Sequence, residues 1–232
     1  MVPTFHLETP QPAPCFSKTF SEESEILKDK EIIDVFEQSE INLLVELRMG
    51  NGFQEKEYER LVKALTVCAD EWESRTSIPG EVVHTLVGLY DELYNFSLIY
   101  GDEESVRIKK AAENTKKLIQ RCTKDKGDIE PEKARVISRL IEKINEHGNF
   151  FNKLQNGKGM DEQQFERIYQ ELYEIIDEIY SWEEIPKVLV NIFIDFRELD
   201  LFVSQYQDEF KQPEEANKIY DAYERIFSLI FG

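Results

Sequence analysis

The stretch GNGFQEKEYERLVKALTVCADEWESRTSIPG (residues 50–80) returns in altered form as GKGMDEQQFERIYQELYEIIDEIYSWEEIPK (residues 157–187). From Leu44 to Phe96, an ungapped shift of 107 residues gives thirteen identities in 53 positions. Farther along the chain, a shift of 106 residues aligns other identical residues. Self-similarity at a fixed spacing is the sequence signature of repeated structural units, so we interpret the chain as an internal duplication.

Apolar side chains within both stretches recur every three or four residues. The two stripes are Tyr58, Leu61, Leu65, Cys68 and Trp72, and Phe165, Ile168, Leu172, Ile175 and Ile179. This period is typical of amphipathic helices, and no segment alternates as a strand would, so we expect an all-α protein without strands. The expected helices span about 22–48, 54–75, 79–100, 102–124, 131–155, 161–182, 185–211 and 214–231.

The chain divides into an arm and two tandem units. Four of its eight prolines lie near the N-terminus, which predicts an extended arm over residues 1–20. The first four-helix unit is expected over 21–128 and the second, its repeat, over 131–232. A period of 107 residues far exceeds a solenoid repeat of about 34 residues, so each unit is expected to be a small bundle. Packing of the units about a pseudo-twofold axis and a single helical array remain the alternatives.

Glycines open both stretches, at Gly50 and Gly52 and again at Gly157 and Gly159. They follow expected helices rather than strands, and they lack the Gly-Lys-Ser/Thr ending of a phosphate-binding loop. We therefore expect them to end a helix in left-handed conformation and turn the chain.

The composition excludes several functions. The 232 residues include 28 Lys or Arg and 47 Asp or Glu, giving a net charge of -19. Such acidity opposes broad binding to nucleic acid or to anionic membranes, and no apolar run reaches the roughly 20 residues of a membrane span. The N-terminus lacks the pattern of a secretory signal, and Cys15, Cys68 and Cys122 are far apart. Buried free thiols at Cys68 and Cys122 and a cytoplasmic location are expected.

Paired acids in the second stretch suggest a metal-dependent enzyme as an alternative. Glu171, Glu174, Asp177 and Glu178 could hold Mg²⁺ or Mn²⁺ in an all-α nucleotide hydrolase. The competing interpretation is a solvated helix face. No nucleophile motif and no cofactor motif accompanies these acids, so no cofactor is expected.

Glu81 and His84 have the carboxylate–histidine spacing of di-iron bundles. Such sites need the motif twice, and the second unit has Val188 and Asn191 at the matching places. We therefore interpret the two residues as ordinary helical side chains.

The segment Tyr180, Trp182, Glu183 and Glu184 is a candidate for binding another protein. It lies at the end of an expected helix, and it combines two large aromatic side chains with acids. Tyr and Trp are enriched among the residues that anchor protein interfaces. Closure of the bundle end by Trp182 is the structural alternative.

One local exception to the acidity lies between residues 107 and 126, where eight basic residues stand against two acids. The candidates for contact with an acidic partner are Lys109, Lys110, Lys116 and Lys117. The alternative is that these lysines pair with acids of the same chain or lie on a solvated face.

Together these features predict a non-catalytic, acidic protein-binding module, such as an adaptor, an inhibitor or an immunity-type protein. The expected partner is another protein with a basic face, because complementary charge speeds association. The alternatives are the metal-dependent hydrolase and a nucleic-acid mimic whose carboxylates imitate phosphates. Phe5 and Phe16 of the arm could also mediate association into a homodimer.

Overall fold

The computed structural model describes residues 17–125 and 127–231 of the chain, with side chains from residue 30 to residue 230. These residues are overwhelmingly helical, which confirms the all-α prediction. The elements in chain order are α1 (Ser17–Arg48), α2 (Glu55–Trp72), β1 (Ser77–Pro79), α3 (Gly80–Ile99), α4 (Asp102–Cys122), α5 (Pro131–Asn145), α6 (Phe150–Gln155), α7 (Glu162–Tyr180), β2 (Glu184–Pro186), α8 (Lys187–Arg197), α9 (Leu199–Asp208) and α10 (Pro213–Phe231).

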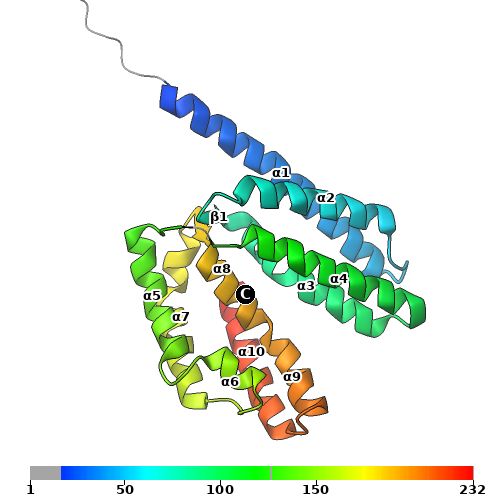
Figure 1. Ribbon diagram of the computed structural model, residues 1–232, viewed down its shortest axis with the longest axis vertical. Coiled ribbons are helices and arrows are strands. Elements are labelled where there is room, and N and C mark those ends of the chain that lie inside the picture. Colours follow the sequence, from blue (N-terminus) through cyan, green and yellow to red (C-terminus); the bar gives the residue numbers. More distant parts are fainter. Residues whose placement is uncertain (1–16, 126, 232) are drawn as a thin grey trace, which may run out of the picture.

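The helices form two groups that diverge from the short strands (Figure 1). In the first group α1 packs on α2 and α3, and α4 packs on α2 and α3. In the second group α7 packs on α5 and α10, and α10 also contacts α8 and α9. The two groups meet where α3 packs against α8 and where β1 pairs with β2. The structure does not establish that the groups are duplicated copies, so the duplication stays a prediction.

The expectation that the chain contains no strands is wrong. β1 and β2 form an antiparallel ribbon in which Ile78 pairs with Ile185. The ribbon is extended by hydrogen bonds from the Gly80 N–H to the Glu183 carbonyl (2.8 Å) and from the Lys187 N–H to the Thr76 carbonyl (3.0 Å). Three residues are too few to display the two-residue period of a strand, and the partner lies far away in the sequence.

Two helices expected to be continuous are each divided. The helix predicted over 131–155 ends at Asn145 and resumes at Phe150, because Gly148 adopts φ +88° and turns the chain. The helix predicted over 185–211 becomes β2, α8 and α9, and its last two parts meet at Glu198.

The N-terminal boundary also differs from the expectation. α1 begins at Ser17 and continues without interruption to Arg48. Residues 17–20 of the predicted arm therefore belong to a helix. The remainder of that prediction, including Phe5 and Phe16, falls on residues 1–16 and lies outside the described residues.

The glycine turns confirm their predicted role. Gly50 and Gly157 adopt φ +75° and +67° directly after helices, and each donates its N–H back to a leucine carbonyl three residues earlier. The N–H groups of the next residues, Asn51 and Lys158, donate to the carbonyl oxygens of the residues immediately before those leucines. This is the paired hydrogen-bond pattern of a helix C-terminus closed by a left-handed residue. Cys68 and Cys122 are both buried, as predicted.

Candidate protein-binding groove

The backbone after α7 determines where the predicted aromatic and acidic residues lie. The helix closes with hydrogen bonds from the Ser181 N–H to the Glu178 carbonyl (3.1 Å) and from the Trp182 N–H to the Ile179 carbonyl (3.0 Å). The chain then enters β2 within two residues. The helix end and the ribbon together hold this segment in a defined path, because each fixes one of its ends.

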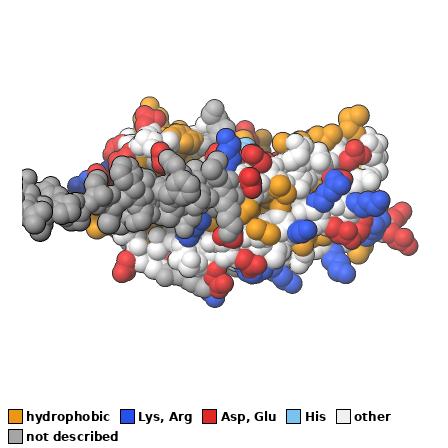
Figure 2. Space-filling model, turned by 90° about the horizontal axis from the view of Figure 1, so that it is seen from above, with side chains coloured by type: hydrophobic (Ala, Val, Ile, Leu, Met, Phe, Trp, Pro, Cys, Tyr) orange, Lys and Arg blue, Asp and Glu red, His pale blue; other side chains and the backbone are white. Residues whose placement is uncertain are grey.

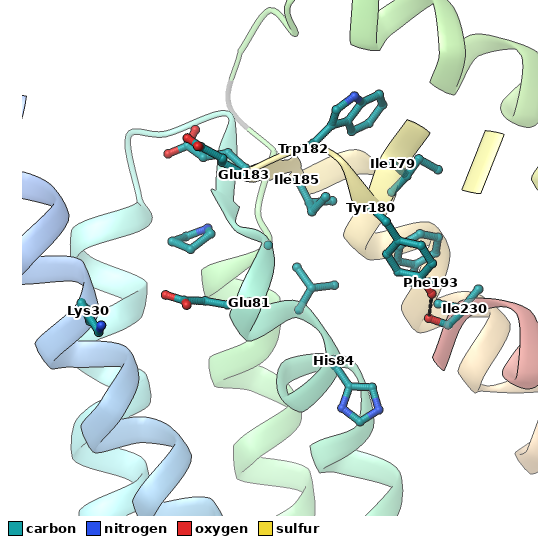
Figure 3. Close-up of a pocket in the computed structure, with 14 residues that line it drawn as sticks. Lys30, Glu81, His84, Ile179, Tyr180, Trp182, Glu183, Ile185, Phe193 and Ile230 are labelled. Atoms are coloured by element: carbon teal, nitrogen blue, oxygen red, sulfur yellow. Dashed lines mark hydrogen bonds between the residues drawn. The ribbon is translucent and has the colours of Figure 1, made fainter. Parts of the chain in front are cut away.

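A groove of about 1040 Å³ lies beside this segment. All four residues predicted from the sequence, Tyr180, Trp182, Glu183 and Glu184, line it (Figure 3). The apolar side chains of the groove come from α3, α7, β2, α8 and α10, namely Val83, Ile179, Ile185, Phe193 and Ile230. A pocket of this size with an apolar lining and a few polar groups is typical of a binding site.

The opposite side of the groove belongs to the first group of helices. Glu81 and His84 project from the beginning of α3, and Lys30 comes from α1 (Figure 3). The sequence pattern indicates ordinary helical residues at Glu81 and His84 and does not reveal that both line the groove. The shared Ile-Pro dipeptides that pair in the ribbon were the available signal, since that pairing brings the start of α3 next to the end of α7.

Tyr180 combines exposure with a fixed position. Tyr180 is 60% exposed. Its hydroxyl nevertheless donates to the carbonyl oxygens of Ile230 and of Leu229, the latter at 3.3 Å. Partial burial of the hydroxyl, and then the nearby charge of Asp177, raise the pKa of Tyr180. The ring is therefore presented to solvent while its polar end is tied to the end of α10.

Trp182 is half-buried and supported by a lysine. The Lys133 ammonium lies 5.5 Å from the centre of the indole ring and donates to the Glu184 carbonyl at 3.1 Å. A cation over the face of an indole is attracted by the ring electrons. The side chains of Glu183 and Glu184 are exposed, and the Glu184 carboxylate accepts a hydrogen bond from Ser77 across the ribbon. On the face seen in Figure 2, hydrophobic side chains likewise lie exposed beside acidic ones.

The predicted lysines lie on α4 and do not line the groove. Lys109, Lys110 and Lys117 are exposed. Lys116 binds the Glu198 carboxylate at 2.7 Å and lies 4.6 Å from the centre of the Tyr90 ring. For Lys116, the structure therefore favours the alternative of pairing within the chain.

The structure does not assemble the carboxylates of the metal alternative into a ligand set. Glu171 and Glu174 both bind Arg139, with contacts of 2.8 Å to its Nε and 3.3 Å to Nη2. Asp177 and Glu178 are exposed on the same helix. Among the described residues no group of three or more His, Cys, Asp or Glu side chains could hold a metal ion. Arg139 offsets one of the two negative charges of this pair and occupies an oxygen of each carboxylate, so both are already engaged within the chain.

A membrane-crossing helix, which must be both long and apolar, is not found in the described part of the chain. No model of a protein family matches the sequence, and neither a curated protein nor a solved structure gives a match. The functional conclusion therefore rests on the groove and its surroundings.

Proposed function

We propose that the chain is a non-catalytic protein-binding module whose groove receives an apolar segment from a basic partner protein. One observation carries this proposal. Tyr180 and Trp182, two aromatic residues of the kind that anchor protein interfaces, line a single groove with an apolar interior, and the acidic Glu183 and Glu184 line it beside them.

The apolar contribution to binding comes from the groove interior. Val83, Phe193 and Ile230 approach it from three different helices, and Trp182 and Tyr180 border it. Burying an exposed apolar side chain of a partner here removes its surface from water, which stabilises a complex by about 25 cal/mol per Å² before the costs of association. A partner residue such as Leu, Met or Phe fits this chemistry.

The charge at the groove determines the kind of partner. Glu81, Glu183 and Glu184 contribute three carboxylates, against Lys30 and His84, in a chain whose net charge is -19. Such a field attracts a basic protein over distances of about 10 Å at 0.1 M salt. An adaptor, an inhibitor or an immunity-type protein would use the groove in this way.

Selection of random peptides displayed on phage, with the full chain immobilised, tests the proposal. Selected peptides are expected to contain an apolar anchor next to Lys or Arg. Their affinity should fall at least about tenfold for Trp182→Ala, the loss typical of an interface anchor, and should decrease for Glu183→Lys and at higher salt.

Tyr173→Ala provides the matched control for Tyr180→Ala. Both tyrosines lie on α7 and both are 60% exposed, but only Tyr180 lines the groove. The control should bind the selected peptides as the unmodified protein does. Peptides that bind both Trp182→Ala and Tyr180→Ala as tightly as they bind the unmodified protein would show that the groove is not the binding site.

A further inference from the structure

The four most exposed large apolar residues among the described side chains lie at one end of the first group of helices. They are Met49 (72%), Leu98 (66%), Ile99 (76%) and Val106 (68%). The Tyr100 hydroxyl donates to the Leu47 carbonyl, which joins the end of α3 to the end of α1. The Ser105 hydroxyl donates to the Ser97 carbonyl, which joins the start of α4 to α3. The apolar end therefore lies where α1 stops and α3 turns into α4, opposite the ribbon (Figure 1).

The fold does not require apolar residues at this end, as the second group of helices shows. Shifts of 107 and 106 residues place polar residues where the first group has Met49, Leu98 and Ile99, namely Asn156, Ser204 and Gln205. Glu104 and Glu215 each accept a backbone N–H that follows a glycine turn, so these acids occupy equivalent places. Two residues after them, the first group has Val106 and the second has Asn217. An exposed apolar surface that folding does not need is typical of a protein contact site.

Val106 lies at the centre of the exposed face of α4. Successive residues of a helix are about 100° apart, which places Val106 opposite the buried Thr115. Glu103 and Lys110 flank Val106 along the helix, and both are exposed. They are seven residues apart, or about two turns, so they lie on the same side of the helix. No ion pair within the described residues engages either of them.

This face of α4 is complementary in charge to itself. When α4 packs antiparallel on α4 of a second copy about a twofold axis at Val106, Glu103 of each copy faces Lys110 of the other. The neighbouring Asp102 and Lys109 are also exposed and add a second acid and a second lysine to the two ends of the contact. A parallel arrangement would place the acids of the two copies against each other. Charges beside an apolar helix seam set the partner and its orientation in this way.

We propose that the chain forms a symmetric dimer through this apolar end, with α4 of the two copies antiparallel and Val106 at the twofold axis. Such a contact uses the same surface patch on both copies. Leu98 and Ile99, joined to α4 by the turn at Gly101, extend the apolar contact. The acids of the second copy are then the acidic partner predicted for Lys109 and Lys110. The surface contains no residue of the groove, so this inference does not depend on the proposed function.

Sedimentation equilibrium of the full chain tests the proposal at about 0.15 M salt, which screens the net charge beyond about 8 Å. The molar mass is expected to rise towards that of two chains between about 5 and about 500 µM, with a dissociation constant of about 100 µM or lower. A chain that remains monomeric at about 500 µM overturns the proposal.

Val106→Asn introduces the residue found at the equivalent place of the second group. Because Val106 is exposed in the monomer, the substitution leaves the core intact. It should raise the dissociation constant at least about tenfold, since two valines lose their burial in each dimer. A dimer that Val106→Asn leaves unchanged uses another surface, which also overturns the proposal.

A charge exchange identifies the antiparallel contact. Glu103→Lys and Lys110→Glu should each raise the dissociation constant at least about tenfold, because each creates like-charge contacts twice in the dimer. The double variant should return it to within about threefold of the original value. Since an acid in the first turn also stabilises a helix, circular dichroism of each variant checks that α4 remains folded.

Lys117→Glu is the matched control for Lys110→Glu. It makes the same change of charge at an exposed site of the same helix, but the antiparallel packing places Lys117 beyond the start of α4 of the second copy. The control should leave the dissociation constant unchanged. Weakening by Lys117→Glu equal to that by Lys110→Glu, or failure of the double variant to restore the dimer, would overturn the proposed contact.

Discussion

The hydroxyl of Tyr206 donates a hydrogen bond of 3.0 Å to the carbonyl oxygen of Leu154. Tyr100 makes the corresponding bond, of 2.7 Å, to the carbonyl of Leu47. The sequence shifts of 106 and 107 residues align the two tyrosines with each other and the two leucines with each other. In both places the tyrosine hydroxyl is a second donor to a carbonyl near a helix C-terminus, which also accepts the N–H of the glycine three residues later, Gly50 or Gly157.

Replacing these tyrosines should destabilise the protein to different extents. Tyr206 is fully buried and also accepts a hydrogen bond from the Gly159 N–H at 2.9 Å, so Tyr206→Phe leaves that N–H without its acceptor and removes one of the two donors to the Leu154 carbonyl. We expect a loss of about 2–3 kcal/mol in the free energy of unfolding for Tyr206→Phe and about 1 kcal/mol for Tyr100→Phe. Urea denaturation measures both. Equal losses would contradict the assigned role of the second hydrogen bond.

The features that could be predicted from the sequence are those controlled by neighbouring residues. Asp161 caps α7 by accepting the Gln164 N–H at 3.0 Å, a contact between residues only three positions apart. Gly50 and Gly157 turn the chain for an equally local reason, since few other residues adopt positive φ. The ribbon was missed because pairing of Ile78 with Ile185 depends on how the two groups of helices pack.

The residues of the candidate site likewise include some that a local sequence pattern reveals and others that only the fold brings together. Tyr180 and Trp182 could be found because aromatic residues at a helix end form a local pattern. Glu81 could not be assigned to the site, because only the fold brings α3 to the end of α7. The ion pair of Asp91 with Arg197, which lies outside the groove, could not be predicted either, since a single charged residue on a helix looks solvated until its burial is known.

A methyl group at Gly80 should disrupt the junction of the ribbon with α3. A Cβ there would lie 3.1 Å from the Trp182 carbonyl oxygen and 3.2 Å from that of Glu183, both of them backbone atoms that cannot rotate away. We expect Gly80→Ala to lower the free energy of unfolding by about 1–3 kcal/mol and to weaken peptide binding at the groove.

Gly88→Ala, in the same helix, is the control for this substitution. The nearest atom to a Cβ at Gly88 is the flexible end of Glu92, at 3.9 Å. Because Ala is the better helix former, this variant should gain about 0.5–1 kcal/mol. The midpoint temperatures of thermal unfolding should therefore shift in opposite directions for the two variants. A higher midpoint for Gly80→Ala would contradict the predicted clash of its Cβ with the backbone carbonyl oxygens.

Lys187 connects the two groups of helices through a fully buried ammonium. Its Nζ donates to the carbonyl oxygen of Trp72 at 2.5 Å and to that of Lys124 at 3.3 Å. We expect Lys187→Met to lower the free energy of unfolding by about 2–3 kcal/mol, because carbonyls near two helix C-termini lose a charged donor. The exposed Lys158→Met should change it by less than about 0.5 kcal/mol. Similar urea midpoints for both variants would contradict this role.

Buried carboxyl groups should make the folded chain most stable in mildly acidic solution. Burial is the main reason that the pKa values of Asp91 and Glu40 rise to about 7 and that of Asp195 to about 6. The charged groups that act on Asp91 are Arg197, Glu198, Asp200 and Lys116, and those that act on Glu40 are Glu92, Arg48 and Glu37. Other carboxylates have lowered pKa values because of hydrogen bonds to basic side chains or to backbone N–H groups, namely Glu146, Asp161, Glu166 and Glu215.

Between about pH 4 and pH 7 the folded chain therefore holds protons at Asp91 that the unfolded chain has released. The stability that this proton contributes is complete below the unfolded pKa of 3.8 and is lost as the pH rises through about 7. We expect the free energy of unfolding to increase as the pH falls from 7 to 5, by at most about 1.4 kcal/mol per pH unit for each such group. Below about pH 4 the carboxylates with lowered pKa values reverse the trend.

Urea midpoints measured across this range should show a smaller slope for Asp91→Asn, since its amide does not titrate. A slope unchanged by that substitution would mean that Asp91 is ionised throughout, and the ion pair with Arg197 would then outweigh burial.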